Sequence, residues 1–369
     1  MRRVLYSMDG RSQMASSAPV TPVEPSVPGA PLGEVAEAAR EQQERRQASD
    51  QERRLARRRR YVEQLQGEGL LLVLVIVVVI MWVSSPYFMT SANLLTAASV
   101  VSILGIMAVA ETLLIIAGEI DISIGSVMAF TSVMLGLLIT DGVNIWLATV
   151  IALLLSAGVG IVNAIITVYF KVASLVTTLG TYSIFLGIAY ALSNTMTVTI
   201  GGEGFGSLGS GHIASIPVPV FFSVGTWLIG AAVARFTSLG RHIYATGDNY
   251  EAAVRAGIQA DKIRVGLFIC ISLSAGLAGI IVTSELGAAA PQIGDPYLLA
   301  VVTAVILGGA SLKGGRGTMV GTLIAVAILG VLQNGFALLQ FSSFLEDTVL
   351  GCLLIIAVLT DRLVRRAER

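Results

Sequence analysis

The amino-acid sequence predicts an all-α polytopic membrane protein with about ten transmembrane helices, some of them broken or re-entrant, and with both termini in the cytoplasm. Of its 369 residues, 54% are hydrophobic and only 13% are charged, whereas a soluble domain carries about 25% charged residues. Apolar runs of spanning length recur from residue 67 onward, and the loops between them alternate between basic and acidic. This composition excludes a wholly soluble enzyme, a disordered chain and, for most of the chain, a nucleic-acid binder.

The N-terminal part, residues 1–66, is predicted to be a separate cytoplasmic extension with 12 Arg and 9 acidic residues. Proline at every third position from Pro19 to Pro31 favours an extended chain. Residues 33–66 contain good helix formers but few apolar residues, so we expect a solvated, partly formed helix. The run Arg57–Arg60 is a positive-inside signal or a contact for anionic lipid headgroups; nucleic-acid binding is the weakest interpretation.

The transmembrane domain, residues 67–369, contains ten apolar runs that are candidates for spanning helices. The first ends near Trp82 and Tyr87, aromatic residues typical of a membrane interface. Several runs are shorter than the ~20 residues of a straight span, so tilted, broken or re-entrant pieces are expected. The runs cover residues 67–85, 93–117, 122–140, 146–170, 174–193, 218–236, 265–285, 297–312, 317–339 and 346–361.

The positive-inside rule tests this count. With the Arg-rich extension inside, ten crossings place all basic loops and the C-terminal end on the cytoplasmic side, whereas the opposite side receives acids and His212 but no Lys or Arg. Because a count wrong by one crossing would mix these groups, we predict ten spans. The inside groups are Lys171, residues 237–264, Lys313, Arg316, Arg362, Arg365, Arg366 and Arg369; the outside acids are Asp141, Glu203, Glu285, Asp295, Glu346 and Asp347.

Cysteine and histidine indicate neither redox nor metal chemistry. Cys270 and Cys352 lie in apolar runs without a C-x-x-C motif and are expected to be buried free thiols. His212 and His242 are predicted on opposite sides of the membrane, so they cannot share a metal ion or a catalytic triad. We therefore expect no metal site and no catalytic residues.

The longest hydrophilic interruption after residue 70 is Thr237–Arg264. Asn249 or Asp248 can accept hydrogen bonds from the free N–H groups of a helix start. A short helix over about Tyr250–Ala256 should follow and end at Gly257, a typical C-terminal cap. The stretch is either a simple connector or, as its length, basic flanks and alanine-rich face favour, a docking element for another protein. That face is expected to consist of Ala252, Ala253 and Ala256.

A second polar interruption, Ile115–Val127, has Gly118 and Gly125 on either side of a turn between two apolar helices. Asp121 or Ser123 can cap the following helix, whose positive N-terminal end tolerates an acid. The turn is either a hairpin turn on the cytoplasmic side or a lining of an inner gate. Upstream, Glu111 is the one acid placed well within a span, which makes it a functional candidate.

A third interruption, Leu307–Gly321, contains six glycines and cannot be an ordinary helix. Gly317 and Gly321 form a G-x-x-x-G pair that allows close helix packing. The stretch Gly309–Gly314 begins like a Walker A phosphate loop, but Gly315 takes the place of the lysine. The chain itself is therefore not expected to hydrolyse ATP.

These three elements together resemble the sugar-type permeases of bacterial ABC importers, which include the ribose transporter membrane subunit and belong to the branched-chain amino acid/ribose permease superfamily. The sequence GDNYEAAVRAGI resembles the family's G-x-N-x-x-A-A-x-x-x-G-I loop. IIAGEIDISIGSV resembles its GGIDLSVGS signature, with Glu119 where glycine is commoner, and LGGASLKGGRGTMVG resembles its LGGxSLxGGxGxxxG element. The likeness covers about residues 90–361, nearly the whole membrane part, and leaves out residues 1–66.

The resemblance implies a permease subunit, in the bacterial plasma (inner) membrane, that translocates a monosaccharide or similar small polar solute. A separate ATPase subunit would drive it and would hold the ATP and magnesium, so this chain has no cofactor of its own. The implied partners are a second permease copy or a paralogue, ABC ATPase subunits, an extracytoplasmic solute-binding protein and the lipid bilayer.

The resemblance also implies roles for two groups of residues. The ATPase-coupling loop would comprise Gly247, Asp248, Asn249, Glu251, Ala252, Ala253, Ala256, Gly257 and Ile258. The candidates for the gate or pathway are Glu111, Gly118, Asp121, Ser123, Gly125, Ser126, Gly308, Gly309, Ser311, Gly314, Gly315 and Gly317.

Other functions compete with this one. Permeases for branched-chain amino acids share the broader fold, and the sequence does not distinguish their substrates from sugars. An ion-coupled secondary transporter should show several acids or a lysine in mid-span, where only Glu111 qualifies. A membrane-embedded enzyme would need a catalytic arrangement that the sequence lacks.

Overall fold

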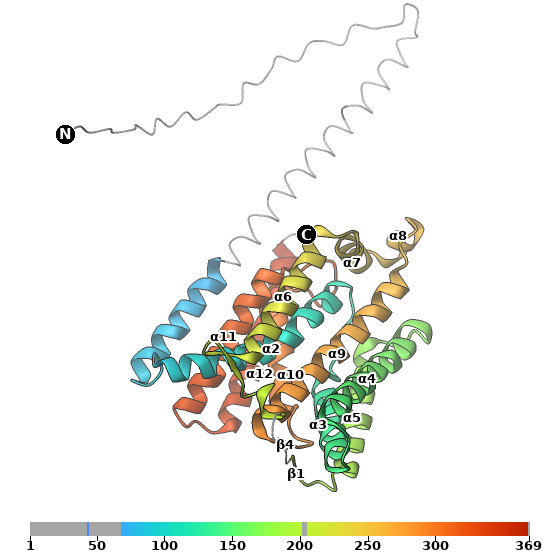
Figure 1. Ribbon diagram of the computed structural model, residues 1–369. Coiled ribbons are helices and arrows are strands. Elements are labelled where there is room, and N and C mark those ends of the chain that lie inside the picture. Colours follow the sequence, from blue (N-terminus) through green and yellow to red (C-terminus); the bar gives the residue numbers. More distant parts are fainter. Residues whose placement is uncertain (1–42, 44–67, 201–204, 368–369) are drawn as a thin grey trace, which may run out of the picture. The chain divides into compact units, whose positions relative to one another are not determined.

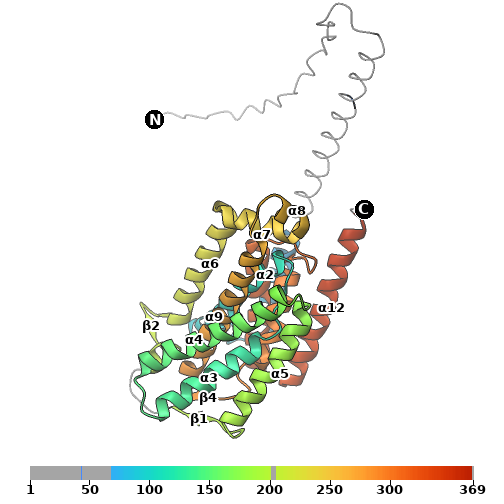
Figure 2. The same cartoon turned by 90° about the vertical axis from the view of Figure 1, so that its right-hand side faces the viewer.

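The computed structural model describes residues 68–200 and 205–367, together with residue 43, and Figures 1 and 2 show a bundle of helices. The predicted extension lies outside the described residues apart from residue 43. The first described helix spans Glu68–Ser84. The others are α2 (Ser91–Ile116), α3 (Ile124–Thr140), α4 (Ile145–Ala164, continued by a π-helical turn Ile165–Tyr169), α5 (Ser174–Leu192), α6 (Val218–Phe236), α7 (Ser238–Asp248), α8 (Tyr250–Arg255), α9 (Ala260–Leu286), α10 (Asp295–Leu307), α11 (Met319–Leu338) and α12 (Ser343–Ala367).

Each of the ten predicted apolar runs coincides with a helix. The largest differences are at α12, which ends at Ala367 rather than at 361, at α9, which begins at Ala260 rather than at 265, and at α10, which ends at Leu307 rather than at 312. Among the described residues, seven helices are long and apolar enough to cross a membrane, whereas the first helix, α3 and α10 are shorter. A protein with several spanning helices is confirmed; the number of crossings and the orientation of the termini stay predictions.

Helix α2 lies at the centre of the bundle. Every residue from Ser102 to Ala117 is buried, and α6, α9, α10 and α11 pack around it. The helix is apolar on all sides, which is the pattern of a helix surrounded by other helices or lipid. The buried apolar residues of α2 form one large hydrophobic core with residues of α3, α9, α10 and α11. The carboxyl group of Glu111 is therefore placed in the interior, where its exposed fraction is 0%.

Helix α10 is too short for a straight span. Its 13 residues span about 20 Å, less than the ~30 Å hydrocarbon core of a bilayer. Gly294, directly before α10, lies against the backbone of Gly125 in the first turn of α3, and Ala289 lies against Gly136 near the end of α3. The chain from Ala289 to Gly294 thus runs back along α3, and α10 begins beside the start of that helix.

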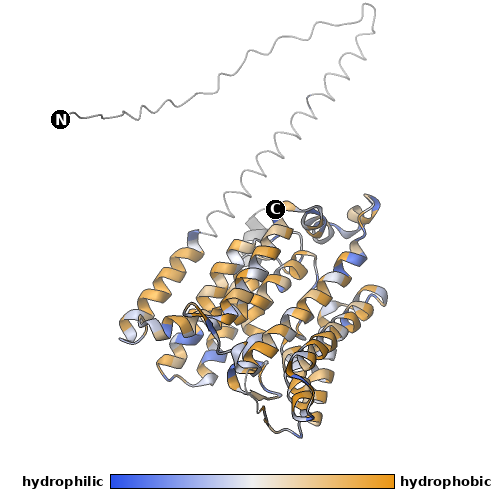
Figure 3. Cartoon of the chain, viewed as in Figure 1, coloured by the Kyte–Doolittle hydropathy of each residue, from blue (hydrophilic) through white to orange (hydrophobic). Residues whose placement is uncertain are grey.

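The loops contain elements that hydropathy did not predict. Two short antiparallel pairs join β1 (Val198–Thr199) to β4 (Ala288–Ala289) and β2 (His212–Ile213) to β3 (Ile216–Pro217). Helix α7 was also not predicted. In Figure 1, α7 and α8 lie at one end of the bundle and β1 and β4 at the other, and Figure 3 shows hydrophilic stretches in α7 and α8 against mainly hydrophobic bundle helices.

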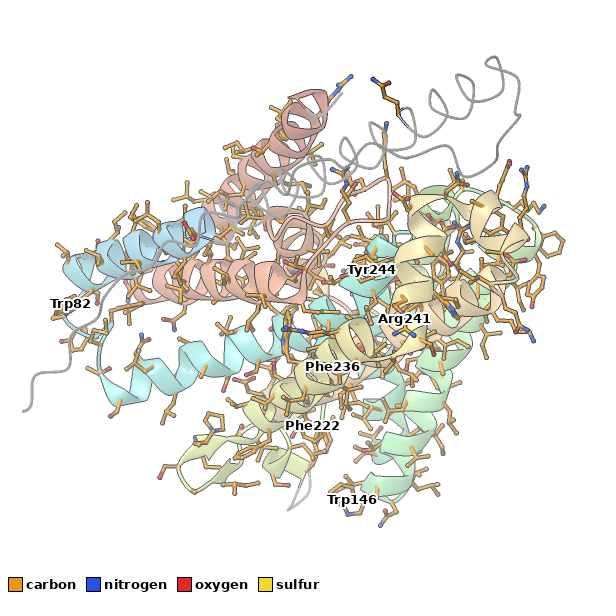
Figure 4. The ribbon with its side chains drawn as sticks, turned by 90° about the horizontal axis from the view of Figure 1, so that it is seen from above. Trp82, Trp146, Phe222, Phe236, Arg241 and Tyr244 are labelled. Carbon is orange, nitrogen blue, oxygen red and sulfur yellow. The ribbon has the colours of Figure 1, made fainter. Side chains whose placement is uncertain are left out.

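The expectation of buried cysteines is wrong, because both Cys270 and Cys352 are exposed on the surface of the chain. In a membrane protein the outer helix faces remain apolar toward lipid, so apolar neighbours in sequence do not predict burial. Trp82 and Trp146 are likewise more than half exposed and are labelled in Figure 4 on the first helix and on α4.

Candidate functional site

The predicted short helix in the 237–264 stretch is present as α8, Tyr250–Arg255. Asn249 precedes it in extended conformation, and its side-chain oxygen accepts a hydrogen bond from the N–H of Ala252 at 3.0 Å. This is the bond of an N-terminal cap, so Asn249 rather than Asp248 serves as the cap. The helix ends before Gly257, whose φ of +82° is a left-handed conformation that favours glycine. Both predicted ends of the helix are confirmed.

Helix α8 is exposed to solvent on all sides except one. Glu251, Ala252 and Ala256 are exposed, and Ile258 is partly buried. Ala253, however, is only 4% exposed. The prediction of one alanine face directed at a partner is therefore wrong for Ala253, because the helix turns this side chain toward its own chain. A surface groove of about 600 Å³ borders the same segment, lined by Ser238, Leu239, His242, Gly257, Ile258, Gln259, Lys262, Ile263, Gly266, Leu267 and Cys270.

Gly247 and Asp248 belong to the last turn of α7. Gly247 lies against the C-terminal end of α2, where a Cβ atom would collide with the carbonyl oxygen of Ile116 and lie 2.6 Å from the backbone nitrogen of Gly315. Tyr244, labelled on α7 in Figure 4, donates from its hydroxyl to the carbonyl oxygen of Gly317 at 2.8 Å. Helix α7 is thus fastened to the end of α2 and to the glycine-rich loop.

The glycine-rich loop between α10 and α11 packs against the ends of both α2 and α7. The N–H of Gly315 donates to the carbonyl oxygen of Ile116 at 2.8 Å. A Cβ atom at Gly314 would lie 2.8 Å from the Cα of Gly118 and 2.7 Å from the carbonyl oxygen of Gly247. Gly314 also has a φ of +82°, so both the close approach and the backbone conformation require glycine. We call Gly118, Gly247, Gly314 and Gly315 the glycine junction.

The glycine junction joins the three separately predicted motifs at one end of the bundle. This agrees with the predicted topology, which puts the α2–α3 turn, the α7–α8 segment and the α10–α11 loop on the same side. Close helix packing by glycine also occurs nearby, although not as predicted: Gly321 lies against Gly308, and Gly317 lies against the side chain of Ile116. Ser311 is buried in the loop, and Gly309 has a φ of +92°.

The α2–α3 turn leads into a second group of polar residues, which we call the buried carboxylate cluster: Glu111, Asp121, Ser123 and Asn163. All four side chains are 0% exposed. The N–H of Asp121 donates to Oε1 of Glu111 at 3.2 Å, and Ser123 donates to Oδ1 of Asp121 from its N–H at 2.7 Å and from its Oγ at 2.5 Å. Asn163 Nδ2 donates to Asp121 Oδ2 at 3.2 Å and to Ser123 Oγ at 2.8 Å.

Asp121 and Ser123 lie in the turn between α2 and α3, and both are completely buried. The expectation that one of them caps α3 is wrong: Ser123 is the residue before the helix but makes no capping bond, and Asp121 uses its Oδ1 on Ser123 instead. Ser126 in turn donates to the carbonyl oxygen of Ser123 at 2.8 Å. The cluster therefore fixes the shape of the turn between α2 and α3.

Sequence reasoning missed Asn163 and Arg264. Asn163 stands in the apolar helix α4, where a single amide was a detectable but overlooked signal of a buried polar contact. Arg264 was counted only as a basic residue of the loop, yet its Nη1 lies 2.9 Å from Oε1 of Glu119. Its guanidinium also lies over the ring of Tyr250, 4.6 Å from the centroid. The hydroxyl of Tyr250 donates to Asp261 at 2.7 Å, and this hydrogen bond raises the pKa of Tyr250 above its usual value.

The two histidines lie in different elements, His212 in β2 and His242 in α7, and Figure 2 shows these elements well apart. Within residues 68–200 and 205–367, His, Cys, Asp and Glu form no group of three that would hold a metal ion.

Comparison with known proteins agrees with the motifs. The family described as "Branched-chain amino acid transport system / permease component" matches residues 93–358. The ribose import permease protein RbsC of Bacillus subtilis is 36% identical over 300 residues, which is 81% of this chain and 93% of that protein. RbsC of Escherichia coli K12 is 37% identical over 281 residues, or 75% and 88%. The L-arabinose ABC transporter permease protein AraH of Azospirillum brasilense is 30% identical over 301 residues, or 82% and 89%.

No solved structure matches the chain significantly. The matched region nevertheless contains the glycine junction, α8 and the buried carboxylate cluster, and it leaves the N-terminal extension outside. The family match covers well over half of the chain, and the two ribose permeases, each more than 30% identical in sequence, align over nearly their whole length. The chain therefore belongs to this permease family, and the family members that it resembles are permeases of sugar ABC importers.

Proposed function

We propose that this chain is the membrane-spanning subunit of an ABC importer for a monosaccharide or similar small polar solute in a bacterial plasma membrane. Its similarity to ribose and arabinose permeases supports the solute class. A separate ATPase, which binds the ATP and magnesium, docks on the segment Gly247–Ile258. Two permease chains, identical or paralogous, form the path, and an extracytoplasmic solute-binding protein delivers the solute to the opposite side.

The observation that carries this proposal is the position of α8. It is a capped, largely exposed helix at one end of the bundle, and α7 next to it packs directly on the end of the central helix α2 through Gly247. A protein that displaces α7 and α8 therefore displaces the glycine junction as well. That is the mechanical connection through which an external ATPase can act on the membrane helices.

The test is co-purification with the cognate ATPase. Ala252→Trp, on the exposed side of α8, should abolish the complex while leaving the thermal stability of the chain unchanged. Ala92→Trp is the matched control, because Ala92 is also exposed on a helix but lies at the other end of α2, about 36 Å from its C-terminal end by helix length. The docking assignment is wrong if Ala252→Trp binds the ATPase as well as Ala92→Trp does.

The solute class needs its own measurement. A thermal-shift screen of the cognate binding protein should give a stabilisation with a monosaccharide. A shift with leucine and with no sugar would instead favour the branched-chain amino acid alternative.

A second candidate function is ion-coupled transport without an ATPase. The structure adds one observation in its favour, because Asp121 joins Glu111 as a second completely buried acid. Uptake that persists in proteoliposomes with an ion gradient but without ATP would support this function and reject the importer. Uptake that requires ATP and the ATPase would reject the ion-coupled function.

A further inference from the structure

We propose that Arg264 is a positioning residue that couples α8 to the turn between α2 and α3 through Glu119; the proposal rests on the docking of an ATPase at α8. The guanidinium of Arg264 touches both elements at once. It lies over the ring of Tyr250, the first residue of α8, and its Nη1 pairs with Glu119 at 2.9 Å. Its Nη2 also donates to the carbonyl oxygen of Ala117 at 3.4 Å.

Burial decides which ion pair of this region holds elements together. The side chains of Arg264 and Glu119 are 19% and 11% exposed. The neighbouring pair of Arg255 and Glu251 is 81% and 79% exposed and lies within α8 itself. Exposed pairs are screened by water and salt and contribute little, whereas removing one partner of a shielded pair leaves a charge without compensation. The Arg264–Glu119 pair is therefore the one that resists separation.

The contact with α8 is held in a defined orientation. The hydroxyl of Tyr250 donates to Asp261 at 2.7 Å, and Asp261 and Arg264 lie on consecutive turns of the start of α9. The ring is thus held against the guanidinium, and a planar guanidinium stacks favourably on an aromatic face. A shift of α8 relative to α9 changes this stacking and with it the position of Arg264.

The contact with the turn continues into the interior. Ala117 and Glu119, which Arg264 contacts, flank Gly118 of the glycine junction. Two residues further, the N–H of Asp121 donates to Glu111, and the N–H of Ile120 donates to Ser174 of α5 at 3.3 Å. A displacement of the turn therefore reaches the buried carboxylate cluster and the start of α5. Arg264 connects the exposed docking surface to groups inside the membrane domain.

The experiment uses the complete importer, with permease, ATPase and binding protein, reconstituted in proteoliposomes. It measures ATP hydrolysis, uptake and their ratio for Glu119→Gln, Arg264→Gln and the double variant. We expect each single variant to lower the uptake per ATP at least tenfold while the ATPase still binds. Because both changes remove the same contact, the double variant should be no worse than the worse single variant. Arg235→Gln, which changes an exposed arginine at the end of α6 outside the docking segment, should behave like the unaltered importer.

Arg264→Lys guards against variants that do not fold. Lysine keeps a positive charge beside Glu119 but loses the planar group that stacks on Tyr250. We expect normal thermal stability and an intermediate uptake per ATP, a split that a purely structural ion pair would not produce. Unchanged uptake per ATP in Glu119→Gln, additive losses in the double variant, or losses that merely follow falling thermal stability would each overturn the proposal. If the unaltered chain binds no ATPase at all, the proposed function fails together with this inference.

Discussion

Replacing Gly247 by alanine is the sharpest test of the glycine junction. Gly247 lies in the segment proposed for ATPase docking, but the position that a side chain would occupy faces the chain's own backbone. A Cβ atom there would collide with the carbonyl oxygen of Ile116 and lie 2.6 Å from the backbone nitrogen of Gly315. Both obstacles are backbone atoms, so no side-chain rotation can relieve the overlap. Either α7 moves away from α2 or the α10–α11 loop shifts.

The size of the effect follows from these contacts. Overpacking a tightly packed site costs about 1–3 kcal/mol. The carbonyl oxygen of Ile116 also accepts the N–H of Gly315 at 2.8 Å, and losing that hydrogen bond adds about 1 kcal/mol. We therefore expect Gly247→Ala to destabilise the chain by about 2–4 kcal/mol, enough to lower the melting temperature by several degrees.

The assay is thermal unfolding of the purified chain in detergent, followed by size-exclusion chromatography after heating. Gly180→Ala is the matched control, because Gly180 is exposed in the interior of α5 and a Cβ atom there has nothing within 4 Å. Alanine at this position should be neutral or stabilise by roughly 0.5–1 kcal/mol. The reasoning is refuted if Gly247→Ala melts with the unaltered chain but fails to bind the ATPase, since the glycine would then serve the partner and not the junction.

Three further predictions follow from the same geometry. Asn249→Ala removes the cap of α8, costs about 1 kcal/mol and should weaken ATPase binding about fivefold in a titration, whereas Asn249→Asp keeps the affinity; equal affinities for all three chains would contradict the cap. Asn163→Leu removes two donors from the buried carboxylate cluster and should destabilise by roughly 1.5–3 kcal/mol in the same unfolding assay, while the exposed Ser183→Ala should not; a stable Asn163→Leu chain would contradict the cluster's role. The hydrogen bond to Asp261 raises the pKa of Tyr250. The contribution of this bond to stability is therefore complete below the ordinary tyrosine pKa of about 10 and disappears as the pH rises through the raised pKa. ATPase binding should stay constant from pH 6 to 9 for the unaltered chain and for Tyr250→Phe, and a loss of binding within this range would reject the assignment of the Tyr250–Asp261 bond.

The helices themselves were predictable because their signals are local. Hydropathy over consecutive residues located all ten apolar runs, and the cap residues Asn249 and Gly257 marked both ends of α8 in the sequence alone. Helix α7 was not predicted because its sequence mixes polar and apolar residues and contains two glycines, a pattern that hydropathy alone assigns to a loop. The two-residue strands escaped because such short segments carry no periodicity.

The sites were only partly predictable, because their contacts join residues that are far apart in the chain. Asn163 is 42 positions from Asp121, and Arg264 is 147 positions from Ala117. A motif can indicate that Asp121 or Gly247 is special, but it does not name the partner. The orientation of Ala253 was likewise set by packing against the chain and not by the spacing of alanines along α8.

The sequence by itself determined that the chain is a multi-pass membrane protein of the permease family, since composition, apolar run length and three motifs each depend only on neighbouring residues. Only the tertiary structure decided that the three motifs meet at the glycine junction, that Asp121 is enclosed with Glu111 and Asn163, and that Arg264 connects α8 to the α2–α3 turn. The physical reason is that backbone-to-backbone approach and buried hydrogen bonds arise from how helices pack in three dimensions. Their partners become defined only when the chain has folded.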